Sequence, residues 1–176
     1  MRNRARAQDC TLDCRVIIGE GIAHWYSDHL SHFFVVQTRF AAKIEHIGFE
    51  GVAHGGVIAT VMDEVMVWAA SWSGKRFCLC GEMSVRFRRR ADVGLILVCT
   101  AQVESTRSKL IATTGQATDE SGRVVASATG KYVPLSDEDN RHFLSTLLDD
   151  PATAATAELL RRGDGADRRR NFSRPI

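Results

Sequence analysis

Four residues in the middle of the chain have the types and spacing that acyl-transfer chemistry needs. The sequence reads His54-Gly55-Gly56, and Asp63 follows seven positions after Gly56. Paired glycines let a ligand approach the backbone closely. Amide hydrogens at a helix start, together with the helix dipole, stabilise the negative charge that develops on a carbonyl oxygen. Asp63 can attack that carbonyl or activate a water, while His54 assists at the oxyanion or orients the loop.

A long buried helix is predicted to carry these residues. Apolar residues recur at helical spacing over 55–70 and cover most of the circumference, which is typical of a buried helix. Asp63 and Glu64 are its only charged residues. A buried carboxylate needs a partner, so either another element supplies one for Asp63 or the side chain faces a cleft. Glu64 points about 100° away from Asp63 and is expected to be structural.

The spacing along this helix predicts a dimer. Seven residues at roughly 1.5 Å each separate Gly56 from Asp63 by about 10 Å. An oxyanion donor and a nucleophile must both come within about 3 Å of one carbonyl group. Two helices packed antiparallel across a two-fold axis meet this requirement, because each lends its amino end to the aspartate of the other.

Strands are predicted on both sides of the helix. Residues 33–41 are rich in β-branched and aromatic types. After the helix, strands are predicted over four further stretches: 80–90, 94–104, 109–118 and 123–133. Their short connections, including a polar turn at 119–122, predict antiparallel neighbours in a four-stranded meander. The fold class is α+β, with a sheet of five to six strands wrapped around one helix.

The segment from Gly51 to Glu64, GVAHGGVIATVMDE, resembles the signature of the hotdog thioesterase superfamily in its phenylacetate-type branch. Residues 82–89 resemble the next strand of that family, and Gly122 its late hairpin. The resemblance implies a dimer or tetramer acting on acyl-CoA or acyl-carrier-protein thioesters, without a cofactor beyond the CoA of the substrate. It also implies that Asp63 is nucleophile or base and that a glycine amide polarises the carbonyl.

Three positions depart from this family. Many members have Asn or Gln where this chain has Gly48, although His46 lies nearby. A Ser or Thr that often positions the lytic water corresponds to Cys80, which is either a small buried residue or part of the site. The proline of the family after the Phe-Arg-Arg stretch is Arg90. These departures concern water activation rather than the glycine pair and Asp63.

Basic residues cluster at 86–90 and again at 107–109. One interpretation is a solvated sheet face, and the other is a clamp for the phosphates of CoA, which arginine suits by geometry and charge. The candidate substrate contacts are Arg88, Arg89, Arg90, Arg107 and His46. A zinc site among Cys10, Cys14, His24, His29 and His32 is disfavoured, because no ligand pair has tight spacing.

Composition limits the remaining possibilities. The 176 residues are 44% hydrophobic with a formal charge of +2, and the five cysteines are irregularly spaced, which favours a reduced, cytoplasmic protein. Neither a membrane span nor a nucleic-acid partner is expected. The expected organisation is a loose segment over 1–15, the main domain over 16–135, a short helix over 136–148 and a disordered tail over 149–176. The leading hypothesis is a homo-oligomeric acyl-CoA thioesterase; the alternative is a hotdog module that binds acyl-CoA without turnover.

Overall fold

The structure is a computed structural model that describes residues 35–146 and residue 160. The predictions for residues 1–34 and for the tail from 149 onward therefore lie outside the described residues, apart from Leu160, which is buried. The elements follow in the order β1 (Val35–Ala41), η2 (Ile44–His46), β2 (Ile47–Phe49), β3 (Val52–Ala53), α2 (Gly55–Gly74), β4 (Cys78–Phe87), β5 (Ile96–Arg107), β6 (Leu110–Asp119), β7 (Val124–Pro134) and α3 (Asp137–Thr146).

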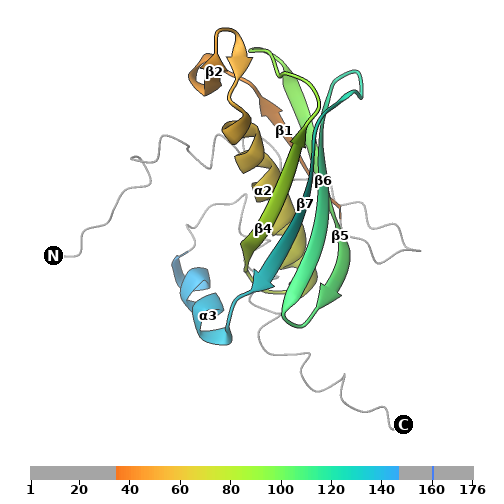
Figure 1. The fold of residues 1–176 in the computed structure, drawn as a ribbon. Helices are drawn as coiled ribbons and strands as arrows, with labels where there is room; N and C mark the ends of the chain where they lie inside the picture. Colours follow the sequence, from red (N-terminus) through yellow and green to blue (C-terminus); the bar gives the residue numbers. More distant parts are fainter. Residues whose placement is uncertain (1–34, 147–159, 161–176) are drawn as a thin grey trace, which may run out of the picture.

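One helix lies against a single antiparallel sheet. The five strands are ordered β1-β5-β6-β7-β4, and α2 crosses one face of the sheet (Figure 1). The small β2–β3 hairpin lies at the amino end of α2, and α3 lies near its carboxyl end (Figure 1). This arrangement confirms the predicted α+β class with one long helix wrapped by an antiparallel sheet. Among the described residues, no helix is long and apolar enough to cross a membrane.

Small residues in the sheet make room for the helix. Met62 and Met66 of α2 are fully buried. A Cβ atom at Gly115 of β6 would lie 2.9 Å from Met62 Cε, and one at Gly130 of β7 would lie 2.9 Å from Met66 Cε. The missing side chains thus let α2 pack closely, with thioethers that adapt to the surface of the curved sheet.

The predicted position of β4 in the sheet is wrong. A short connection was expected to make the strands at 80–90 and 94–104 neighbours, but β4 pairs with β7 and β5 pairs with β1 and β6. Crossing from β4 to β5 spans three strand spacings, roughly 14 Å. The connecting residues 88–95 reach about 26 Å when extended, so the length permits a crossover.

Hydrogen bonds hold this crossover over the amino end of α2. The Ala53 amide donates to the Ala91 carbonyl at 2.8 Å, and the Gly94 amide donates to the Ala42 carbonyl at 2.7 Å. Val52 also forms an isolated β-bridge with Asp92. The segment therefore completes the loop from which the helix begins, instead of turning back as a hairpin.

The predicted turn between β6 and β7 is confirmed. Gly122 has a φ of 81°, a conformation that favours glycine, and its amide donates to the Asp119 carbonyl at 2.9 Å. The Asp119 carboxylate accepts from the amides and side chains of Ser121 and Arg123. These bonds, with that of the Ser121 hydroxyl the strongest cause, hold the pKa of Asp119 well below its usual range.

A buried amide fastens α3 near the carboxyl end of α2. The Asp139 amide donates to Ser136 Oγ at 3.1 Å, so Ser136 caps the start of this helix. Asn140 is fully buried, and its Oδ1 accepts from the Phe77 amide at 2.8 Å. An ion pair between Arg76 and Asp137, at 2.8 Å, adds a second link.

Candidate active site

The histidine of the His-Gly-Gly motif caps the helix that follows it. His54 has extended backbone angles, and its carbonyl accepts from the Val57 amide at 3.0 Å. Its Nδ1 accepts from the Gly56 amide at 2.9 Å. The Gly55 amide has no acceptor among the described residues, so it is the free donor at this helix start.

Two glycines enclose the imidazole of His54. A Cβ atom at Gly56 would lie 2.8 Å from His54 Nδ1, and a Cβ atom at Gly48 would lie 2.8 Å from His54 Cδ2. Any side chain at either position would push the ring out of its capping position. Gly48 is one of the positions that depart from the family pattern. The lack of a side chain there leaves the space that the His54 ring occupies.

The other end of the candidate site contains a partly buried hydrogen bond between a carboxylate and a phenol. The Tyr132 hydroxyl of β7 donates to Asp63 Oδ1 at 2.7 Å, and Tyr132 is 0% exposed. Burial, reinforced by the charge of Asp63, raises the pKa of Tyr132 far above its usual range, so the phenol remains protonated. Tyr132 is thus the partner that α2 itself does not provide for Asp63.

Cys80 completes this cluster from the edge strand. It lies opposite Tyr132 in the β4–β7 ladder and interacts with both the Asp63 carboxylate and the Tyr132 hydroxyl. Partial desolvation, with a contribution from Asp63, raises the pKa of this thiol above its usual range. Cys80 is exposed, whereas Cys78 and Cys99 are buried. Burial raises the pKa of Cys78 to about 11 and that of Cys99 to about 12. A protonated thiol therefore lies at the open side of Asp63.

The helix start and the aspartate have different neighbours. Gly55 lies beside the half-exposed ring of Phe87, which a Cβ atom at Gly55 would meet at 3.2 Å. Asp63 lies beside Cys80, at the opposite end of β4. The structure thus brings Asp63 together with Cys80, and His54 together with Gly56. Within the described part of the chain, no hydrogen bond joins the two groups.

Glu64 turns away from Asp63, as expected. Its Oε1 accepts from Trp68 Nε1 at 2.7 Å, one turn further along α2. Burial raises the pKa of Glu64 above its usual range, and the hydrogen bond from Trp68 opposes this effect. The two adjacent carboxylates therefore have separate partners on separate faces of the helix.

His46 is packed beneath the loop that leads to the helix. Its Nδ1 accepts from the Lys43 amide at 3.1 Å, and its ring lies 5.1 Å from that of Phe40. Its carbonyl accepts from the His54 amide at 2.7 Å. His46 thus supports the helix start through its backbone, and its predicted contact with substrate stays a prediction.

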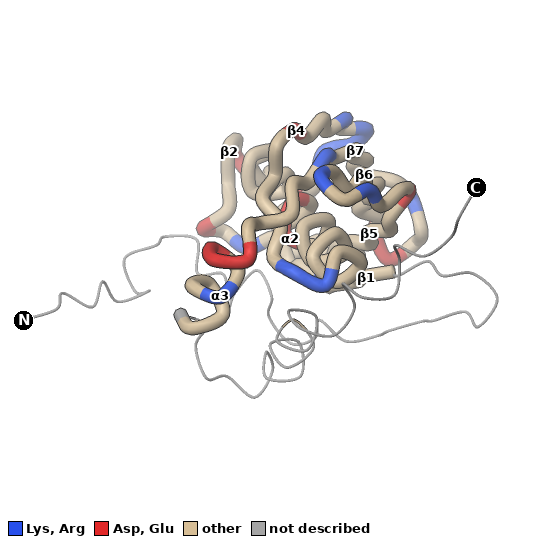
Figure 2. The backbone as a smooth tube through the Cα atoms, turned by 90° about the horizontal axis from the view of Figure 1, so that it is seen from below, with Lys and Arg blue, Asp and Glu red and all other residues tan. Residues whose placement is uncertain are grey.

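The predicted arginine contacts lie in two places, with Arg88, Arg89 and Arg90 directly after β4 and Arg107 at the end of β5. Arg89 donates to the Val124 carbonyl at 2.6 Å, and Arg90 pairs with Asp92 at 3.0 Å. Arg88 faces the outer side of the sheet. Arg107 ends β5 at the β5–β6 turn, roughly 26 Å along the sheet from this group by strand rise. Figure 2 shows basic residues near the labels of β4 and β7.

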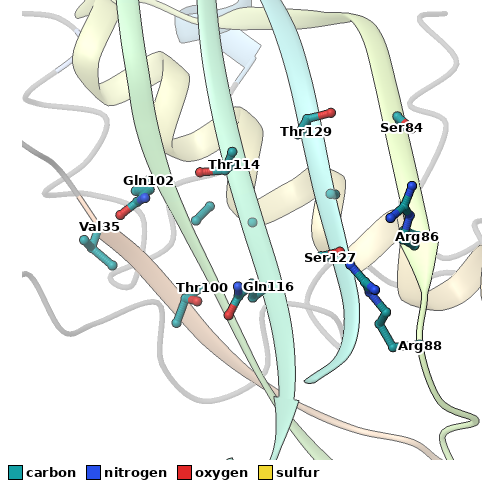
Figure 3. Close-up of a pocket in the computed structure, with 13 residues that line it drawn as sticks. Val35, Ser84, Arg86, Arg88, Thr100, Gln102, Thr114, Gln116, Ser127 and Thr129 are labelled. Atoms are coloured by element: carbon teal, nitrogen blue, oxygen red, sulfur yellow. The ribbon is translucent and has the colours of Figure 1, made fainter. Parts of the chain in front are cut away.

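A polar hollow of about 500 Å³ lies on the sheet face away from α2. Figure 3 shows it with α2 behind the strands. Its polar lining comes from six positions on β5, β6 and β7, from two on the edge strand β4 and from one just after it: Thr100, Gln102, Thr114, Gln116, Ser127, Thr129, Ser84, Arg86 and Arg88. Because the sheet separates it from Asp63, this hollow is not the place where the candidate catalytic groups meet.

Tyr132 is the site residue that sequence reasoning missed. Its signal in the sequence is weak: an aromatic residue at an inward position of the last strand, two residues after Gly130. Recognising it requires the β4–β7 register and the rotation of α2. Neither follows from the sequence when β4 is placed beside β5.

Comparisons with known proteins agree with this architecture. Residues 50–126 match the family model described as "Thioesterase superfamily", a stretch that includes the helix start and Asp63. A search of curated proteins gave no match to this sequence.

Solved structures of low sequence identity share the fold. A Streptococcus mutans protein bound to acetyl-CoA is 18% identical, with a TM-score of 0.54 over 59% of this chain and 82% of that one. The E. coli PaaI protein from the phenylacetic acid degradation operon is 20% identical, with a TM-score of 0.54 over 59% and 73%. Zebrafish thioesterase superfamily member 2 is 21% identical, with a TM-score of 0.56 over 69% and 92%. The described part of this chain therefore has the hotdog fold of the thioesterases.

Proposed function

We propose that this protein hydrolyses acyl-CoA or acyl-carrier-protein thioesters, with Asp63 as nucleophile or general base. The observation that carries the proposal is the environment of Asp63: a carboxylate on a largely apolar helix, held by Tyr132 and open toward Cys80. Support also comes from the thioesterase family model, which spans this residue. Two similar folds, from S. mutans and Streptococcus pneumoniae, were solved with acetyl-CoA and coenzyme A.

The two roles of Asp63 differ in the bond that it forms. As nucleophile, a carboxylate oxygen attacks the thioester carbon, the C–S bond breaks and CoA thiolate leaves; water then cleaves the anhydride and restores Asp63. As general base, Asp63 takes a proton from the water that attacks the same carbon. In both cases, negative charge develops on the carbonyl oxygen and requires donors at the helix start.

The Gly55 amide suits the role of oxyanion donor because its hydrogen is free. The Gly56 amide already donates to His54 Nδ1, so an oxyanion would have to replace the imidazole there. His54 assists in this proposal by holding the loop until substrate enters. In the neutral ring whose Nδ1 accepts, the proton resides on Nε2, which leaves a second donor for the substrate.

The proposed active site is shared between two copies of the chain. About 10 Å of helix separates Gly56 from Asp63, too far for one carbonyl. β4 is an edge strand that carries the half-exposed side chains Leu79 and Phe87. An edge of this kind is open to pairing with a second copy. A dimer or a dimer of dimers in which one helix start meets the partner's aspartate would complete the site.

The proposal also includes the residues that bind CoA, the branch of the family and the location of the protein. The proposed contacts for the phosphates of CoA are Arg88, Arg89, Arg90 and Arg107. Because Arg107 lies at the other end of the sheet, these contacts would come from two places in the molecule. The phenylacetate-type branch, the absence of a cofactor and a cytoplasmic location are retained as expectations. A module that binds acyl-CoA without hydrolysis is the second candidate, favoured by the replacement of Ser or Thr by Cys80.

The test is release of free thiol from a panel of aliphatic and aromatic acyl-CoAs. We expect Asp63→Asn to lower kcat by about 100-fold or more, the usual effect of removing a general base. Asparagine keeps an oxygen that can accept from Tyr132, so the fold is retained. Glu64→Gln is the matched control, since this neighbouring carboxylate binds Trp68, and it should leave kcat within about two-fold.

Two results would overturn the enzyme proposal. Turnover unchanged by Asp63→Asn would exclude Asp63 as the reactive group. Saturable binding of CoA by the wild type, with no thiol released from any acyl-CoA, would establish the binding module instead.

A further inference from the structure

We propose that Tyr132 is the positioning residue of Asp63, and that it directs one carboxylate oxygen toward the substrate by holding the other. This inference rests on the proposed function, because it assigns Tyr132 a role in the same site. The phenol lies on β7 and Asp63 on α2, and the two meet through one hydrogen bond of 2.7 Å.

The orientation of the carboxylate follows from this contact. Asp63 Oδ1 accepts from Tyr132, so rotation about the last side-chain bond would break the hydrogen bond. Oδ2 is therefore kept on the side that the Tyr132 hydroxyl does not occupy. A carboxylate fixed in this way loses less freedom when it attacks or accepts a proton, and such preorganisation accelerates a reaction.

The sheet is built to let the phenol reach Asp63. Tyr132 and Gly130 lie on the same face of β7, two residues apart. A Cβ atom at Gly130 would lie 2.6 Å from Tyr132 Cε2 and 3.2 Å from its hydroxyl oxygen. The ring thus lies along the strand over the space that a side chain at 130 would fill. Only glycine at this position permits the observed course of the ring.

The groups around Asp63 decide whether the Tyr132 hydrogen bond persists as the pH changes. The titratable groups facing Asp63 are Tyr132 from β7, Cys80 from β4 and the adjacent Glu64 on α2. Burial raises the pKa of Tyr132 above its usual range, so the hydroxyl keeps its proton and can donate it to the carboxylate. A hydrogen bond to the charged form favours that form.

The pH profile of kcat/KM tests this role. In Tyr132→Phe, the ring stays and the hydroxyl is lost, so we expect the acid limb to move to higher pH by about one unit. We expect kcat at the plateau to fall about ten-fold while KM changes less than three-fold, since substrate binding is not involved. Gly130→Ala should shift the acid limb in the same direction, because the new Cβ displaces the phenol.

Ile111→Val is the matched control for lost packing. Ile111 is fully buried and lies opposite Tyr132 in the β6–β7 ladder, but its side chain is apolar and cannot donate to Asp63. It should lower stability without moving the acid limb. If Tyr132→Phe behaves like this control, with an unshifted profile, the positioning role is excluded.

A carbon-13 NMR titration of the Asp63 carboxyl separates this inference from the proposed function. If no acyl-CoA is hydrolysed, the proposed function fails, and the titration still reports on Tyr132. A midpoint that is higher in Tyr132→Phe than in wild type supports the hydrogen-bond role. An unchanged midpoint overturns it, whether or not the protein is an enzyme.

Discussion

Both faces of the sheet carry polar side chains. Those on the outer face are exposed to water, whereas those on the inner face are covered by α2. On the outer face, Gln102, Gln116 and Thr129 are exposed and line an open hollow. On the inner face, Tyr132 and Thr113 are 0% and 1% exposed. Water satisfies the outer groups, whereas each inner group must find a partner in the protein or remain without one.

Two carboxylates, the buried Asp119 and the half-buried Asp63, show how much the hydrogen-bond partners of such a group reveal. Asp119 accepts four hydrogen bonds from Ser121 and Arg123 within a single turn, a full set of local partners. Asp63 accepts from Tyr132, which is 69 residues away along the chain, and lies beside an exposed thiol. The first arrangement stabilises a turn. The second leaves part of the carboxylate open, which is what a reactive group requires.

Removing the inner carboxylate should give the largest effect. In Asp63→Ala, the Tyr132 hydroxyl stays buried and loses its acceptor, so the free energy of unfolding should fall by about 1–3 kcal/mol beyond the loss of activity. Asp63→Asn retains an acceptor and should lose much less stability. Urea denaturation of both variants measures the difference. Equal stabilities would mean that Tyr132 finds another partner, and the contrast between the two faces would weaken.

The contribution of Asp119 to stability should depend on pH. The pKa of Asp119 is lowered in the folded state, so its charge stabilises the fold above the unfolded pKa of about 3.9, and that stabilisation is lost as pH falls through the folded value. Asp119→Asn should therefore be less stable than wild type at pH 7, and the gap should narrow below about pH 4. Urea denaturation across this range measures the gap.

Glu120→Gln is the control for the Asp119 experiment. Its side chain is 61% exposed and pairs with Arg39 at the surface, an interaction of small energy. We expect a stability close to that of wild type at every pH. A gap for Asp119→Asn that persists unchanged to pH 2 would show that lost packing, rather than charge, explains the effect.

Periodicity along the chain predicted the elements but not all of their neighbours. The helix expected over 55–70 is observed at Gly55–Gly74, because an apolar pattern of period 3.6 is a local property. The order of the strands is not local. The segment 88–95 is long enough either to form a hairpin or to cross three strand spacings. Its hydrogen bonds to the β2–β3 region stabilise the crossover.

The candidate site was likewise predicted where it depends on local sequence and missed where it depends on tertiary packing. The glycines, His54 and Asp63 lie close in sequence and share one motif, so spacing alone identified them. Tyr132 reaches Asp63 over the space that Gly130 leaves open, and the β4–β7 register places Cys80 beside Tyr132. The partner of this half-buried carboxylate depends on tertiary packing, which no spacing in the sequence reveals.

The outer face should give the smallest effect. Arg86 lines the outer hollow and makes no ion pair among the described residues, so Arg86→Ser breaks no ion pair there. We expect the free energy of unfolding to change by less than about 0.5 kcal/mol and kcat/KM for acyl-CoA to stay within about two-fold. A ten-fold rise in KM with unchanged kcat would contradict this. The phosphates of CoA would then lie on the face opposite Asp63, and the substrate would have to pass around β4. Because β4 is an edge strand, with Arg86 next to the inward-facing Phe87, that path is short.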